Sequence, residues 1–164
     1  MRRPPRSRPP REATPAYLER VALHYLERHA GSEARLRRVL RGRIRRSFEA
    51  HGAPDPEAGE QTLDELVAKL KRLGYVDDAR LARSRVKVLR GRGKSARAIR
   101  AALAAQGVDR EVVDAAIDAE GGDELEAART YARRRRLGRT ERDLAKMARA
   151  GYSYDVARRA LEDR

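Results

Sequence analysis

Apolar residues recur along this chain at intervals of three and four, and no stretch alternates with a period of two. Such spacing places apolar side chains on one face of an α-helix. The run from Leu63 to Leu73 shows this pattern clearly. Gly74 follows it and can adopt the left-handed conformation that ends many helices. The pattern therefore predicts an all-α protein built of short amphipathic helices.

Residues that favour helix starts precede each apolar stripe, because their side chains accept hydrogen bonds from free backbone N–H groups. These cap residues are Thr14, Ser32, Thr62, Asp77, Ser95, Asp109, Asp123, Thr140 and Ser153. The stripe of the second helix ends at Phe48, which we expect to face the core. We predict later helices over residues 62–73, 77–89, 96–106, 110–120, 123–136, 141–150 and 154–163. Residues 50–61 are rich in Pro, Gly and acids, which predicts a loop.

The helix end at Gly74 has counterparts further along the chain. An apolar residue four positions before the glycine and another directly after it recur at Gly107 and Gly151. The glycines stand 33 and 44 residues apart (107 − 74 and 151 − 107). Such spacing favours a repeat of two or three short helices, each too small to close a core alone. The alternative is that capped amphipathic helices share this ending by chance.

The composition narrows the class of partner. The 164 residues carry a net charge of +14, which predicts attraction to nucleic acid or to an acidic protein surface. Cysteine is absent, which excludes disulfides and is compatible with a reducing compartment. No apolar run is long enough for a membrane span, and the arginine-rich N-terminus lacks a signal peptide's hydrophobic segment. We therefore expect a cytoplasmic protein. Residues 1–13 contain five Arg and four Pro without periodicity, so we expect them to form a disordered basic arm.

Several basic residues are candidates for contact with such a polyanion. They are Arg38, Arg41, Arg45, Arg92, Lys94, Arg133, Arg134 and Arg136. At about 100° per residue, those on the second predicted helix form a ridge opposite its apolar stripe. A merely solvated face would show the same pattern. Those near the end of the helix over 123–136 also suit the helix dipole, so a structural role fits them equally.

Gly93-Lys94-Ser95 resembles the end of a phosphate-binding P-loop. The full pattern needs a glycine five residues before Gly93, where Val88 stands, so a helix cap is favoured. Arg92 and Lys94 beside a helix start are still placed to meet a backbone phosphate. No nucleophile–base pair and no metal-ligand spacing stands out. We expect no enzyme activity, no catalytic residues, no cofactor and no metal.

Two blocks resemble one known family more specifically. They are Gly-Tyr-Val-Asp-Asp-Ala-Arg-Leu-Ala over 74–82 and G-K-S-x3-I-x3-L-x3-G-V over 93–108. A third stretch, from Leu36 to Ser47 near the N-terminus, adds to this likeness. Over about residues 16–163 the chain is similar to RecX, the family of regulators of the RecA recombinase. Leu81 stands where that family commonly has Phe, and the third repeat is irregular and arginine-rich.

The resemblance implies three tandem three-helix repeats in an elongated, slightly curved array. The repeats would cover 14–76 (with the loop over 50–61 and its last helix in 62–76), 77–120 and 121–164. It also implies a monomeric, non-enzymatic modulator, most simply an inhibitor, with a place in DNA repair, homologous recombination and the SOS response. Such a protein would bind the RecA–single-stranded DNA filament in its groove and limit its extension or promote its disassembly.

Two other functions fit the same residues. A helix-turn-helix-like DNA-binding protein acting without RecA would also consist of short capped helices joined by tight turns. It would need base-reading side chains, yet Asn is absent and Gln occurs only at Gln61 and Gln106. A basic adaptor for an acidic protein is the third possibility, and it would bind neither DNA nor RecA.

Overall fold

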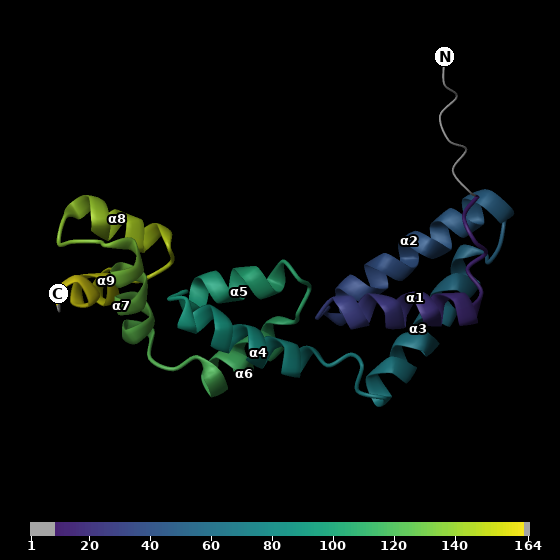
Figure 1. Cartoon of the computed structure of the whole chain (residues 1–164), viewed down its shortest axis with the longest axis horizontal. Helices are drawn as coiled ribbons and strands as arrows, with labels where there is room; N and C mark the ends of the chain where they lie inside the picture. The colour runs from purple at the N-terminus through teal and green to yellow at the C-terminus, as the bar shows by residue number, and fades with distance from the viewer. Residues whose placement is uncertain (1–8, 163–164) are drawn as a thin grey trace, which may run out of the picture. The chain divides into compact units, whose positions relative to one another are not determined.

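The computed structural model describes residues 9–162, which form nine α-helices and no strand (Figure 1). This confirms the prediction of an all-α protein. The helices are α1 (Pro15–Arg28), α2 (Glu33–His51), α3 (Pro56–Arg72), α4 (Asp78–Gly91), α5 (Ala96–Ala104), α6 (Arg110–Glu120), α7 (Glu124–Arg135), α8 (Glu141–Arg149) and α9 (Tyr154–Glu162). Within residues 9–162, each helix is too short or too polar to span a bilayer.

The helices form three consecutive groups of three. The first compact unit ends at Asp77 and contains α1–α3, and the second starts at Asp78 and contains α4–α9. Buried apolar side chains form three clusters, one within α1–α3, one within α4–α6 and one within α7–α9. The fold is therefore three tandem three-helix repeats. The repeat boundaries given above stay a prediction.

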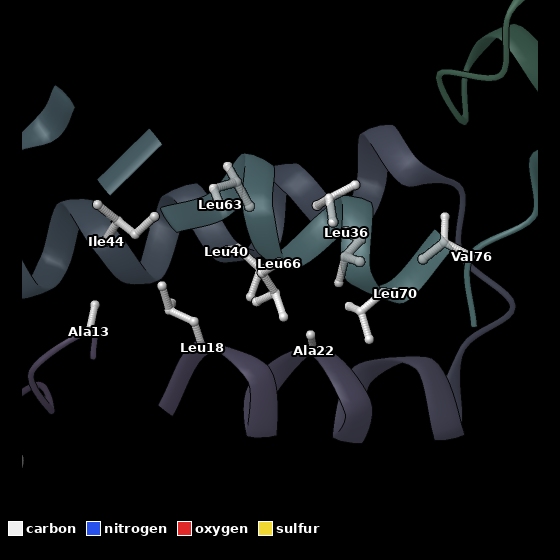
Figure 2. Close-up of a cluster of buried hydrophobic side chains, with 11 residues drawn as sticks. Ala13, Leu18, Ala22, Leu36, Leu40, Ile44, Leu63, Leu66, Leu70 and Val76 are labelled. Carbon is white, nitrogen blue, oxygen red and sulfur yellow. The ribbon is translucent and has the colours of Figure 1, made fainter. Parts of the chain in front are cut away.

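The core of the first unit lies where its three helices meet (Figure 2). Leu18 of α1, Leu40 of α2 and Leu70 of α3 are each fully buried and point into the space between the three helices. Complete burial of such a side chain contributes about 2 kcal/mol through the hydrophobic effect. Ala22, also fully buried, lets α1 approach the other two helices closely. Each helix thus gains stability only through the other two.

Most predicted helix starts are confirmed. Thr14, Ser32, Ser95 and Thr140 each accept a hydrogen bond from the backbone N–H three residues later, at 3.2 to 3.3 Å. Each bond satisfies an N–H group that the first helical turn leaves without a partner. Asp109 stands at the cap position of α6, but its side chain accepts no such bond.

The loop predicted over 50–61 is shorter than expected and covers only residues 52–55, because α2 extends to His51 and α3 begins at Pro56. The Asp55 side chain accepts a hydrogen bond from the Ala58 N–H at 2.9 Å, and proline suits the first helical position. Thr62 does not start the helix; inside α3, its hydroxyl donates to the Ala58 carbonyl at 2.9 Å. The first turn of α3 carries no large apolar side chain, so the apolar stripe begins later than the helix.

The predicted basic arm falls mostly outside the described residues, since residues 1–8 are not described. Its last residue differs from the prediction. Ala13 is only 2% exposed and belongs to the core of the first unit. Its N–H donates to the buried Ser47 hydroxyl at 2.9 Å, and that hydroxyl donates to the Ala53 carbonyl at 2.6 Å. Ser47 thereby ties the chain entering α1 to the turn that leaves α2.

The predicted helix ends share one geometry. Gly74, Gly107 and Gly151 have φ angles of 75°, 77° and 94°, in the left-handed region. In each case the next N–H donates to the carbonyl five positions earlier, at 3.0, 3.2 and 3.2 Å. These bonds satisfy carbonyls that the last helical turn leaves free. Arg136 ends α7 in the same way, with a φ of 51° despite its side chain.

The second and third repeats are joined through the turn between α4 and α5. The Tyr152 hydroxyl donates to the Gly93 carbonyl at 2.8 Å, and the Ser95 hydroxyl donates to the Ala150 carbonyl at 2.7 Å. Burial raises the pKa of Tyr152, which keeps this donor protonated. A Cβ at Gly93 would lie only 2.6 Å from the Tyr131 backbone nitrogen. We call this contact between repeats the joint.

Substitution of Gly93 should break the joint. Gly93→Ala places a methyl group against the Tyr131 backbone and forces a side chain onto a φ of 71°. We expect the free energy of unfolding of the second unit to fall by about 3 kcal/mol. Urea unfolding followed by circular dichroism measures this change. Gly91→Ala is the matched control, because no atom lies within 4 Å of its Cβ position. Equal losses of unfolding free energy in the two variants would show that the joint does not stabilise the second unit.

Candidate functional site

The three candidate arginines of α2 lie together on one side of the first unit. Arg38, Arg41 and Arg45 line a hollow of about 690 Å³ between α2 and α3. Gly42 stands among them, and no atom lies within 4 Å of its Cβ position, so the surface is open there. We call this the α2 hollow. The structure therefore brings this group of predicted residues together.

These three cations differ in how far their charge is compensated. Arg41 donates to both carboxylate oxygens of Glu60, at 2.8 and 3.0 Å, and these bonds hold the pKa of Glu60 below its usual range. Such a two-point pair is among the stronger surface ion pairs. Arg45 lies 3.7 Å from Glu49, and Arg38 has no carboxylate partner within residues 9–162. Arg38 and Arg45 are thus the cations most available to a ligand.

Phe48 also lines the α2 hollow, which corrects the prediction that it faces the core. Its side chain is 41% exposed, whereas its neighbour Ser47 is fully buried. The buried position goes to Ser47 because its hydroxyl bonds the two backbone groups described above. Proteins that bind single-stranded nucleic acid combine exposed aromatic rings, on which bases stack, with cations that contact the phosphates.

The Gly93-Lys94-Ser95 turn holds an anion that belongs to the protein itself. The Glu124 carboxylate accepts hydrogen bonds from the Ala96 N–H at 3.1 and 3.2 Å, at the start of α5. Arg90, whose side chain is 10% exposed, forms an ion pair with the same carboxylate. A carboxylate at a helix N-terminus is stabilised by the helix dipole. The cap function favoured from the sequence is confirmed, and the P-loop likeness ends at these three residues.

The remaining candidate residues do not form one site. Lys94 lines a second hollow, of about 340 Å³, which none of Arg92, Arg133, Arg134 or Arg136 lines. Arg133 donates to the Thr130 hydroxyl at 3.2 Å, and Arg136 ends α7. All of these side chains are exposed. Their contact with a polyanion stays a prediction.

Sequence reasoning missed several residues that line the hollows. They include Phe48 in the first unit and Tyr131, Arg135, Lys146 and Arg149 in the second. Lys146 and Arg149 stand three residues apart in a predicted helix, so the sequence already places them on the same helix face. Nothing local indicated that this face meets Lys94. Arg135 stands in a run of four arginines, and four successive helical residues cover about 300° of the helix circumference, so the sequence does not show which of them lines a hollow.

The fold and these surfaces define an all-α protein of tandem three-helix repeats with basic hollows. Residues 77–117 match the second three-helix domain of RecX. The regulatory protein RecX of Myxococcus xanthus is 40% identical over 169 residues, covering 93% of this chain and 88% of that protein. The RecX of Stenotrophomonas maltophilia is 37% identical over 163 residues, covering 94% and 90%. The chain therefore belongs to the RecX family of regulatory proteins.

A solved structure has the same fold. The crystal structure of RecX from Lactobacillus salivarius superposes with a TM-score of 0.68 at 20% sequence identity. The match covers 91% of this chain and 95% of that one. The likeness thus extends over all three repeats, and it agrees with the family membership.

Asp143 should make the third repeat sensitive to acid. Its carboxylate accepts from Lys146 Nζ at 2.6 Å and from the Gly138 N–H at 2.9 Å, which lowers its pKa from 3.8 to about 2. A lowered carboxylate pKa stabilises the fold above the unfolded value, and this contribution is lost as the pH falls toward 2. Asp143→Asn should therefore be less stable than the wild type at neutral pH and lose less stability across that window.

Thermal unfolding midpoints between neutral pH and pH 2 measure this effect. Asp118→Asn is the control, because Asp118 is an exposed residue of α6 and lies outside the turn before α8. Its curve should run parallel to that of the wild type. Parallel curves for Asp143→Asn would show that this carboxylate does not stabilise the fold.

Proposed function

We propose that this protein regulates RecA by binding the RecA–single-stranded DNA filament in its groove. It limits filament extension or promotes disassembly, acts as a monomer in the cytoplasm, and catalyses no reaction itself. The observation that carries this proposal is the match to proteins named regulatory protein RecX over 93% of the chain. Because the match spans all three repeats, the regulatory role belongs to the whole array rather than to one borrowed domain.

The charge of the first unit supports a contact with the DNA inside such a filament. Arg38 and Arg45 stand beside the exposed ring of Phe48 in the α2 hollow. Cations there neutralise phosphates and release counterions, which makes binding sensitive to salt. Arg41 contributes less, since Glu60 already holds its guanidinium. The α2 hollow therefore adds an electrostatic contact to the contacts with RecA itself.

ATP hydrolysis by the cognate RecA on single-stranded DNA tests the proposed function. We expect hydrolysis to fall when this protein is added at amounts well below the RecA concentration. A substoichiometric effect follows because one bound molecule at a growing end stops the addition of many RecA subunits. Unchanged hydrolysis together with tight binding to bare DNA would contradict the proposal. The chain would then act as a DNA-binding module without RecA.

The role of the α2 hollow has its own test. The double variant Arg38→Ala, Arg45→Ala should bind the filament more weakly and with less salt dependence. Each lost phosphate contact on a single strand lowers the slope of log K against log salt by about 0.7, so we expect a decrease of about 1.4. Fluorescence anisotropy at several salt concentrations measures it. Arg41 is left in place because its removal would leave the Glu60 carboxylate without its ion-pair partner.

The matched control for this test is Arg83→Ala, Arg85→Ala. Both residues are exposed on α4 and have no carboxylate partner within residues 9–162, so the net charge falls equally. The control should keep most of the wild-type slope. Equal decreases in both double variants would mean that only the net charge matters. An unchanged slope in the α2 variant would exclude the α2 hollow from the DNA contact.

A further inference from the structure

The second unit contains a concave basic surface that the regulatory role does not by itself explain. It is the hollow of about 340 Å³ between the α4–α5 turn, α7 and α8. We call it the basic hollow. Its polar and aromatic lining consists of Lys94, Tyr131, Arg135, Lys146 and Arg149. The basic residues come from two repeats, and the joint holds them against one another.

The charge of the basic hollow is largely uncompensated. No carboxylate is among its lining residues. Lys94, Arg135 and Arg149 have no carboxylate within 4 Å in the described part of the chain. Lys146 does have one, since Asp143 lies 2.6 Å from its ammonium group. A concave surface lined by one sign of charge concentrates the field and attracts an anion.

The anion at the neighbouring helix start does not fill this hollow. Glu124 is held by the Ala96 N–H and by Arg90, and it is not a lining residue of the basic hollow. The turn therefore has its internal anion already. The ammonium of Lys94 and the guanidinium of Arg149 remain available to an external one.

One wall of the basic hollow combines an aromatic ring with a guanidinium group. The Arg135 guanidinium lies 5.6 Å from the centre of the Tyr131 ring, and the Tyr131 and Tyr152 rings are 5.8 Å apart. Tyr152 is 4% exposed and anchored at the joint, so the Tyr131 ring is held in place. A ring and a guanidinium together form a surface on which a nucleobase stacks. A carboxylate side chain of an acidic protein would pair with the Arg135 guanidinium but would leave the Tyr131 ring unused.

We propose that the basic hollow binds a phosphate group of single-stranded nucleic acid, with the adjoining nucleotide against Tyr131 and Arg135. Lys94 and Arg149 contact the phosphate. Lys146, whose ammonium group is paired with Asp143, adds positive charge to the same hollow. The protein thus has a nucleic-acid contact of its own that does not require RecA. This inference deepens the proposed function by assigning a strand contact to the joint between the second and third repeats.

Binding of the full chain to a short labelled oligothymidylate, without RecA, tests the inference. We expect Lys94→Ala, Arg149→Ala to weaken binding by about tenfold or more, because hydrogen bonds to charged groups are lost. The slope of log K against log salt should decrease by about 1.4. Both side chains are exposed, so the unfolding midpoint should not change. Arg135→Lys keeps the charge, and it should weaken binding while leaving the slope unchanged.

Three outcomes would overturn the inference. The first is an equal loss in Arg83→Ala, Arg85→Ala, which removes the same charge from α4. The second is displacement of the oligonucleotide by pyrophosphate as effectively as by unlabelled oligonucleotide, which would assign the basic hollow to free phosphate compounds. The third is equally effective displacement by polyglutamate, which would assign it to an acidic protein.

The test also separates this inference from the proposed function. If RecA hydrolysis falls as expected while the Lys94→Ala, Arg149→Ala variant binds bare DNA like the wild type, only the inference fails. If this variant loses bare-DNA binding while wild-type protein leaves RecA hydrolysis unchanged, only the proposed function fails.

Discussion

Reversal of the chain at the ends of α3, α5 and α8 depends on a glycine in the left-handed conformation. Gly74, Gly107 and Gly151 adopt it, and each allows the following amide to bond the last helical turn. A residue with a side chain loses about 1–2 kcal/mol in this conformation, which makes Arg136 the exception among these ends. Helices as short as the nine residues of α5 are unstable alone. The turns let them share a core.

The joint is the second constraint, and it links two of the three repeats. At Gly93 the turn before α5 comes so close to Tyr131 of α7 that no side chain fits between them. Tyr152 of the third repeat donates a hydrogen bond to this turn, and Ser95 of the turn donates one back to Ala150 of the third repeat. Because these bonds join backbone to side chain across repeats, α4–α9 form one compact unit. The basic hollow exists only because of this arrangement.

The net charge of +14 says little about where a partner binds, since many of these cations have carboxylate partners. Arg41 bonds both oxygens of Glu60, and Arg90 is held with Glu124 at the joint. Arg38, Lys94 and Arg149 have no such partner in the described chain, and all three line a hollow. The proposed contact with a polyanion rests on these positions, because no carboxylate of the described chain competes for them.

The sequence by itself determined the helices apart from the start of α3, their caps at Thr14, Ser32 and Ser95, and the repeating ends at glycine. These features depend on contacts between residues three to five apart. It also placed the arginines of α2 on one face, since helix geometry alone decides that. Tertiary structure decided the rest. Phe48 is exposed because Ser47 takes the buried position, and Lys94 meets Arg149 because the joint brings distant segments together. Packing between remote residues leaves no periodic pattern in the sequence that would reveal it.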